Sequence, residues 1–323
     1  MDILAFQRQS NSKYISVIVP VYKDLKGLID TVGSIRSCSI PDGYQLELII
    51  VNDGAAPNIS RYCQNQKALE VKIFPNRGSY FARNRGLEHS QGAWIGFVDA
   101  DIFVDKNWIK NGVDELQKYD YVAGKIDVIR DGVSKIVADY QQHVDFNSER
   151  HMNTIHFGPT ANLWIRRSLA EQVGGFNESL FSGGDMEFGR KVYGVANLKE
   201  TFCEDVKVSH PPRTLAGLLS KSKRLAYGHN RMGKTSSFKS EFSLIKTLKR
   251  TLSHRNKDNE SGELLLFRIF LFSHRLLYKL FYKLTKNSTE FEQAVEKEAN
   301  DTQVTEYDYR VTYQVEETTA ETS

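Results

Sequence analysis

The stretch Tyr14-Ile15-Ser16-Val17-Ile18-Val19-Pro20-Val21 decides the fold class of this chain. Its residues are mostly apolar and β-branched, and Pro20 stops the run, a pattern typical of a strand buried on both faces. Residues 24–38 follow with apolar side chains three and four positions apart, which predicts an amphipathic helix. A second apolar strand is predicted at 46–51, and the turn sequence Asn52-Asp53-Gly54 ends it.

The same alternation continues as far as residue 98. Helices are predicted at 58–67 and 79–90, and strands at 71–74 and 94–98. Strands that alternate with helices at this spacing form a parallel α/β sheet covered by helices on both faces. In such sheets, ligands bind beyond the carboxyl ends of the strands. Those ends carry residues 20–22, 52–54, 76–78 and 99–101.

Composition excludes several classes of protein. The chain has 323 residues, 40% of them hydrophobic, so it is not fibrous, wholly disordered or a polytopic membrane protein. Its net charge of +3 argues against general nucleic-acid binding, and no nucleic-acid partner is expected. The N-terminus lacks a basic region followed by an apolar run, and the three scattered cysteines form no disulfide framework. We therefore expect a cytoplasmic protein.

Charge is distributed unevenly along the chain. Residues 207–286 hold 18 Lys and Arg against 4 Asp and Glu, whereas residues 287–323 hold 2 against 10. Such a shift indicates regions with different roles. We predict three of them: a catalytic domain over 1–235, a basic helical extension over 236–286, and an acidic, flexible tail over 287–323.

Three acidic side chains stand at predicted strand ends. Asp99 and Asp101 follow a buried strand directly, where two carboxylates can share one hard divalent cation. A solvated loop is an equally good reading of this pair alone. Asp53 can accept a hydrogen bond from a nucleobase or a ribose, although a turn-forming role beside Gly54 is favoured on sequence alone.

Three further residues suggest chemistry, each with a structural alternative. Arg83 lies in the first turns of a predicted helix, where its guanidinium could bind phosphate oxygens. The alternative is that it belongs to a surface charge cluster. Asp185 follows two glycines at a loop–helix junction. It can act there either as a general base or as the N-cap of the helix. His210 precedes Pro211-Pro212, where a rigid corner can aim its imidazole at a metal, but a lone histidine is more often structural.

In their order and spacing, the motifs of this chain resemble those of family 2 glycosyltransferases of the GT-A fold over roughly residues 14–230. No Gly-x-Gly-x-x-Gly or Walker loop occurs. The resemblance implies a Rossmann-like, mostly parallel sheet flanked by helices. The motifs that carry it are 16–22, 51–54, 76–78, 82–86, 92–101, 158–162, 173–178, 183–185 and 210–211.

The resemblance also implies a role for each candidate residue. Pro20, Tyr22 and Asp53 would hold the nucleotide base and ribose, and Arg83 would lie near the base or the diphosphate. Asp99 would contact ribose and metal. The divalent cation, Mn²⁺ or Mg²⁺, would be held by Asp101 as principal ligand with Asp99 and His210. Asp185 would be the general base.

The implied reaction is inverting transfer of a hexose or N-acetylhexosamine from a nucleoside-diphosphate sugar. Uridine is the expected base, and the expected acceptor is a hydroxyl of a glycan or lipid-linked glycan of the cell envelope. Asn52 and Gly184 replace acidic residues of the family pattern. The Gln-x-x-Arg-Trp signature of processive synthases is absent, so the addition of one sugar is expected. The alternatives are an inactive sugar-nucleotide-binding protein and a nucleotidyltransferase.

Residues 264–284 predict an amphipathic helix. Arg268, Arg275, Lys279 and Lys283 are spaced so that they share one helical face, and the other faces are mainly Leu and Phe. A helix lying in the membrane plane, with its cations against anionic headgroups, fits this pattern best. The alternative is a helix packed on protein.

Overall fold

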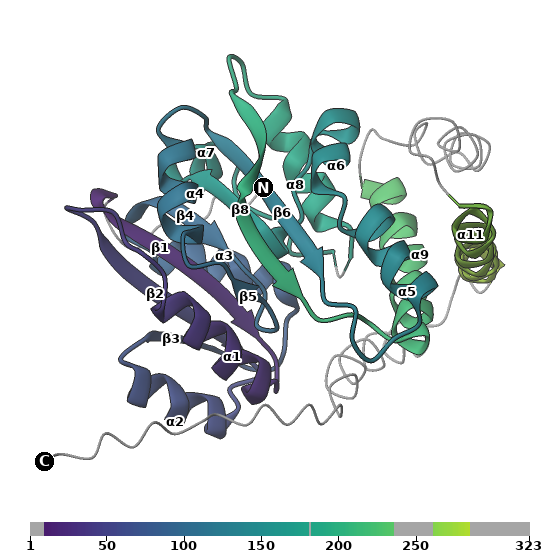
Figure 1. Ribbon diagram of the computed structural model, residues 1–323, viewed down its shortest axis with the longest axis horizontal. Helices are drawn as coiled ribbons and strands as arrows, with labels where there is room; N and C mark the ends of the chain where they lie inside the picture. Colours follow the sequence, from purple (N-terminus) through teal and green to yellow (C-terminus); the bar gives the residue numbers. More distant parts are fainter. Residues whose placement is uncertain (1–9, 181, 236–260, 285–323) are drawn as a thin grey trace, which may run out of the picture.

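The computed structural model describes residues 10–180, 182–235 and 261–284 (Figure 1). The predicted tail over 287–323 lies outside them, as do the first nine residues and most of the basic extension over 236–286. The three domain boundaries therefore stay a prediction.

One eight-stranded sheet organises the chain, in the order β3-β2-β1-β4-β7-β6-β8-β5. Its first half is parallel: β1 pairs with β2 and β4, and β2 pairs with β3. This confirms the α/β prediction made from the opening stretch. The strands of this half are β1 (Asn11–Val21), β2 (Gln45–Asp53), β3 (Leu69–Ile73) and β4 (Gly92–Phe97).

The second half of the sheet mixes strand directions. β7 is antiparallel to β4 and β6, whereas β8 runs parallel to β6 and carries β5 at the edge. The sheet is thus mostly parallel, as the resemblance implied. Its remaining strands are β5 (Phe103–Val104), β6 (Tyr121–Val128), β7 (Leu163–Arg166) and β8 (Glu200–His210).

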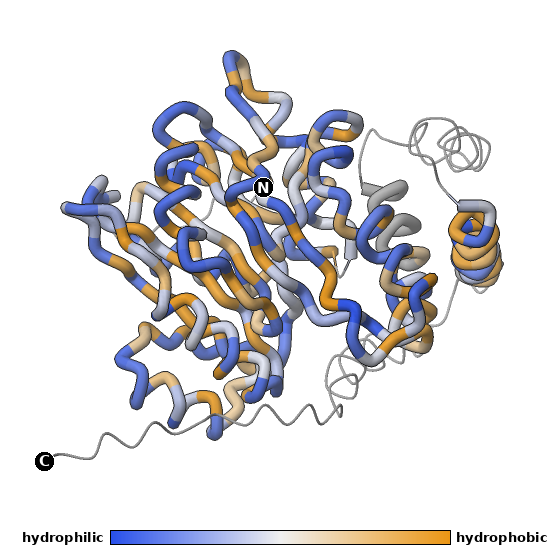
Figure 2. Tube along the Cα trace, viewed as in Figure 1, coloured by the Kyte–Doolittle hydropathy of each residue, from blue (hydrophilic) through white to orange (hydrophobic). Residues whose placement is uncertain are grey.

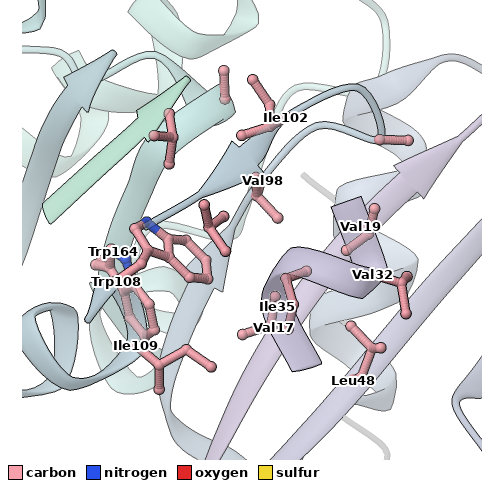
Figure 3. Packing of buried hydrophobic residues seen from close by; sticks show 14 of the residues in the cluster. Val17, Val19, Val32, Ile35, Leu48, Val98, Ile102, Trp108, Ile109 and Trp164 are labelled. Carbon is pink, nitrogen blue, oxygen red and sulfur yellow. The ribbon is translucent and has the colours of Figure 1, made fainter. Parts of the chain in front are cut away.

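Helices cover both faces of the sheet, and each face has its own apolar core. On one face, β1 packs against Val32 and Ile35 of α1, and further along the sheet Trp108 of α4 lies 4.7 Å, centroid to centroid, from Trp164 (Figure 3). Figure 2 shows the hydrophobic stretches along the central strands. The helices around the sheet are α1 (Leu25–Arg36), α2 (Pro57–Gln66), α3 (Ser79–His89), α4 (Trp108–Leu116), α7 (Arg167–Gln172) and α8 (Gly184–Tyr193).

A group of helices stands beside the β6–β8 end of the sheet (Figure 1). Leu264 and Leu271 of α11 are buried with Val137, Tyr140 and Leu218 in a third apolar cluster, so α11 packs on α5 and α9. The group comprises α5 (Lys135–Tyr140), the π-helix Gln141–Asp145, α6 (Ser148–Ile155), α9 (Leu215–Thr235) and α11 (Gly262–Leu284).

The predicted helix over 264–284 is present, but two of its cations do not face outward. Arg268 is buried, and Arg275 hydrogen-bonds Tyr140 of α5. The expectation that the cationic face meets lipid headgroups is therefore wrong for these two residues, because α5 and α9 occupy that side. Among the described residues, no helix is both long and apolar enough to cross a bilayer.

The packing of α11 predicts different costs for two leucines of the same helix. Leu271 is 2% exposed and Leu277 is 67% exposed. Leu271→Ala is expected to lower the free energy of unfolding by about 2–4 kcal/mol, since it leaves a cavity. Leu277→Ala is the matched control, with a change within about 0.5 kcal/mol in urea denaturation. Equal losses for both variants would contradict the observed orientation of α11.

Candidate active site

A pocket opens at the carboxyl ends of β1, β2 and β4. These strands are parallel neighbours, so the segments that follow them meet at one edge of the sheet. The pocket is lined in part by Pro20, Tyr22, Asp53, Arg83, Asp99 and Asp101. All five residues predicted to bind the nucleotide sugar, and the predicted principal metal ligand, therefore lie together.

Asp53 has a structural contact that the sequence did not reveal. Its two carboxylate oxygens accept hydrogen bonds from the backbone N–H groups of Arg77 and Gly78, each at 2.8 Å. Burial raises the pKa of Asp53 to about 6, and these two bonds oppose the shift. Asp53 thus ties β2 to the loop that enters α3, rather than only shaping its own turn.

Arg83 and Asp99 form a close ion pair. The guanidinium Nη2 lies 2.5 Å from Asp99 Oδ1, and Arg83 is only 3% exposed. The surface-cluster alternative is therefore wrong for Arg83. Burial raises the pKa of Asp99, and Arg83 partly offsets this effect. The pair places a buried positive charge in the wall of the pocket.

Asp101 and His210 approach each other across the sheet edge. His210 Nε2 lies 3.9 Å from Asp101 Oδ2, which is too far for a hydrogen bond. His210 Nδ1 donates to the Pro211 carbonyl, so Nε2 presents its lone pair toward Asp101. The pKa of His210 is lowered, mainly by burial. A lowered pKa favours the neutral imidazole, which is the form that binds a metal.

These two side chains suit a divalent cation, since oxygen and neutral imidazole are both common ligands. Asp99 is engaged with Arg83 instead. In the part of the chain that the structure describes, no group of three or more His, Cys, Asp or Glu side chains has the arrangement of a metal site. The three-ligand set of Asp99, Asp101 and His210 stays a prediction.

Asp185 lies in the first turn of α8 but does not cap it. The N-cap is Gly183, whose φ of 82° a glycine adopts without strain. Asp185 Oδ2 instead accepts from the backbone N–H and hydroxyl of Thr160, both at 3.2 Å. Its charge also contributes to the raised pKa of Asp99. The N-cap alternative is therefore wrong, and Asp185 stands near the pocket's acidic residues.

Sequence reasoning assigned no role to three charged or amide side chains of the pocket wall: Asp24, Asn76 and Arg213. Asp24 caps α1 by accepting from Gly27 N–H at 2.8 Å, and burial raises its pKa, with Asp101 adding to the shift. Asn76 lay within a quoted motif. Arg213 follows His210 by three positions, which was the available signal for it.

Comparison with known proteins bears on the family and the fold of the chain. Residues 16–174 match the model of Glycosyl transferase family 2. The glycosyltransferase AglE of Haloferax volcanii is 28% identical over 225 residues, which cover 68% of this chain and 74% of AglE. The glycosyltransferase GlyG of Streptococcus pneumoniae is 30% identical over 115 residues, 34% of this chain and 37% of GlyG, so that match spans less than half of the relative.

A solved structure has the same fold. The mannosyltransferase PcManGT of Pyrobaculum calidifontis, determined with GDP-Man and Mn²⁺, superposes with a TM-score of 0.56 at 15% identity, covering 92% of this chain and 85% of that one. This similarity confirms the predicted GT-A fold. Residues 16–174 therefore form a glycosyl transferase family 2 domain, and the protein is a glycosyltransferase.

Proposed function

We propose that the protein transfers a single sugar, with inversion, from a nucleoside-diphosphate sugar to an acceptor hydroxyl, using Asp185 as general base. The observation that carries the proposal is the convergence of Tyr22, Asp53 and Asp99 in one pocket beside Asp101 and His210. The sugar is a hexose or N-acetylhexosamine, and the expected nucleotide is UDP. PcManGT, a protein of the same fold, was determined with a nucleotide sugar.

A divalent cation, Mn²⁺ or Mg²⁺, fits the donor set of Asp101 and His210. When bound, such an ion neutralises charge on the departing diphosphate. The chain's own contribution is the neutral imidazole of His210, whose orientation is fixed by Pro211 and by the ring of Phe146, 4.5 Å away between centroids. The Mn²⁺ in the PcManGT structure supports this assignment.

Asp185 is suited to accept the acceptor's proton. The Thr160 contacts hold its carboxylate at the start of α8, and it is partly exposed to solvent, where an acceptor can reach it. The acceptor oxygen bonds to the anomeric carbon while the bond from that carbon to the diphosphate breaks. The hydroxyl proton passes to Asp185, and the nucleoside diphosphate leaves with the bonding electrons. One carboxylate suffices because no covalent glycosyl-enzyme forms.

The acceptor is proposed to be a glycan or lipid-linked glycan, met at the inner face of the cytoplasmic membrane. Support comes from α11, which turns an apolar stripe outward: Leu266, Phe270, Leu277, Leu280 and Phe281. Residues 207–286 carry 18 basic against 4 acidic side chains, so this part of the chain is strongly cationic. An anionic bilayer attracts this charge.

Two carboxylate variants separate binding from chemistry. Asp185→Asn is expected to reduce transfer about 10²–10⁴-fold, since the base is lost, while UDP binding with Mn²⁺ is retained. Asp101→Asn is expected to weaken Mn²⁺-dependent UDP binding as well. Calorimetry with UDP, GDP, CDP and dTDP, with and without Mn²⁺, and product analysis with sugar nucleotides measure both effects.

Two results would overturn the assignment. If wild-type protein binds none of these nucleotides, the donor site is wrong and an inactive scaffold is favoured. If Asp185→Asn retains full turnover, another group is the base. A nucleotide-sugar product in place of a glycoside would indicate the nucleotidyltransferase alternative.

The outward stripe predicts membrane binding through its apolar side chains. Replacing Leu266 and Leu277 by serine is expected to abolish co-sedimentation with vesicles that contain phosphatidylglycerol, because the outward stripe loses its two most exposed apolar side chains. Thermal unfolding should barely change, since both side chains are already exposed. Failure of the wild-type protein to sediment with these vesicles would refute membrane contact through α11.

A further inference from the structure

The loop after β8 brings Arg213 to the wall of the donor pocket, where no role has been assigned to it. It lines the same pocket as Asp99 and Asp101 and lies three residues beyond His210. Its positive charge is close enough to contribute to lowering the pKa of His210. Arg213 therefore lies in the wall of the candidate donor pocket, in the neighbourhood of His210.

The backbone of Arg213 is held by a buried glutamine. Gln141 is 0% exposed. Its Nε2 donates to the Arg213 carbonyl at 3.0 Å, and its Oε1 accepts from the Arg213 N–H at 2.7 Å. One side-chain amide thus satisfies both backbone groups of one residue, as a neighbouring strand would. These two hydrogen bonds fix the backbone position from which the Arg213 side chain extends.

Gln141 opens a π-helix that has a second glutamine in the same role. Gln142 donates to the Ile126 carbonyl at 3.0 Å and accepts from the Val128 N–H at 2.7 Å. Val128 is the register partner of His210. Short π-helices are rare and often occur at functional sites. In the π-helix Gln141–Asp145, the Gln142 side chain holds the end of β6 and the Gln141 side chain holds the loop after β8.

The charged side chains that line the pocket indicate what Arg213 could bind. The lining contains the carboxylates of Asp24, Asp53, Asp99 and Asp101, and two arginines, Arg83 and Arg213. Both arginines have contacts within the protein, and that of Arg83 is with Asp99. A nucleoside diphosphate would bring further negative charge into this acidic pocket, and a guanidinium suits its oxygens because it can donate two parallel hydrogen bonds.

We propose that Arg213 binds the diphosphate of the sugar donor and that Gln141 is the positioning residue that holds Arg213 in place. The inference rests on the proposed function, since it needs a nucleoside diphosphate in the pocket. Arg213 remains on the diphosphate as the bond between the anomeric carbon and the diphosphate oxygen breaks, and so stabilises the negative charge of the leaving group.

The test compares UDP with uridine, which lacks the diphosphate, by titration calorimetry in the presence of Mn²⁺. Arg213→Gln is expected to weaken UDP binding about 10- to 100-fold, the range for a lost charge-assisted hydrogen bond, and to leave uridine binding unchanged. Arg213→Lys should recover part of the loss. Arg130→Gln, which removes an exposed arginine outside the pocket, is the matched control and should bind both ligands as wild type does.

Gln141→Ala tests the positioning role. It is expected to weaken UDP binding by a smaller factor, again without affecting uridine, and to add no further loss in the Arg213→Gln background. A merely structural role would weaken both ligands equally. If the wild-type protein prefers GDP, then GDP and guanosine replace the uridine pair.

The outcomes separate this inference from the proposed function. If wild-type protein binds no nucleoside diphosphate, the proposed function fails and the inference fails with it. If wild-type protein binds UDP and Arg213→Gln binds it equally well, the proposed donor site stands and only the inference is overturned. If Arg213→Gln and Gln141→Ala lose affinity additively, Gln141 does not act through Arg213.

Discussion

The parallel pairing of β1 with β2 and β4 is the constraint on which the donor pocket depends. In register, Val21 lies beside Asn52, and Ile18 lies beside Phe97. The segments that leave these three strands therefore emerge side by side, and polar residues distant in sequence become neighbours. Apolar side chains on both faces hold the strands in that register, because a slip of one residue would exchange what each face buries.

The other half of the site depends on a polar residue inside the core. Asn162 is 0% exposed; its amide donates to the carbonyls of Lys125 and Val206 and accepts from Trp108 Nε1, each at 2.8 Å. It lies where the pairing of β6 with β8 shifts register between Gly124 and Lys125. The amide satisfies backbone groups that the shift would leave unpaired, and β8 can then continue to His210.

Electrostatics explains why an acidic pocket can serve an anionic substrate. Asp53 and Asp99 both have raised pKa values because they are buried, yet each is held by donors, backbone N–H groups for Asp53 and Arg83 for Asp99. The Asp53 carboxylate therefore positions a loop, and the Asp99 carboxylate positions the Arg83 guanidinium. The hydrogen bonds between Gln141 and the backbone of Arg213 act in the same way, because they fix the position of a charged residue at the pocket wall.

The sequence by itself determined the α/β class, the parallel first half of the sheet and the strand ends at which polar residues gather, because these follow from local apolar periodicity and turn residues. Ordered motifs also determined the family. Only the tertiary structure decided which alternative each polar residue fulfils. Gly183 rather than Asp185 caps α8, Asp53 binds a loop 24 residues away, and α11 turns Arg268 inward. These outcomes depend on contacts between segments far apart in the chain, and no local pattern encodes them.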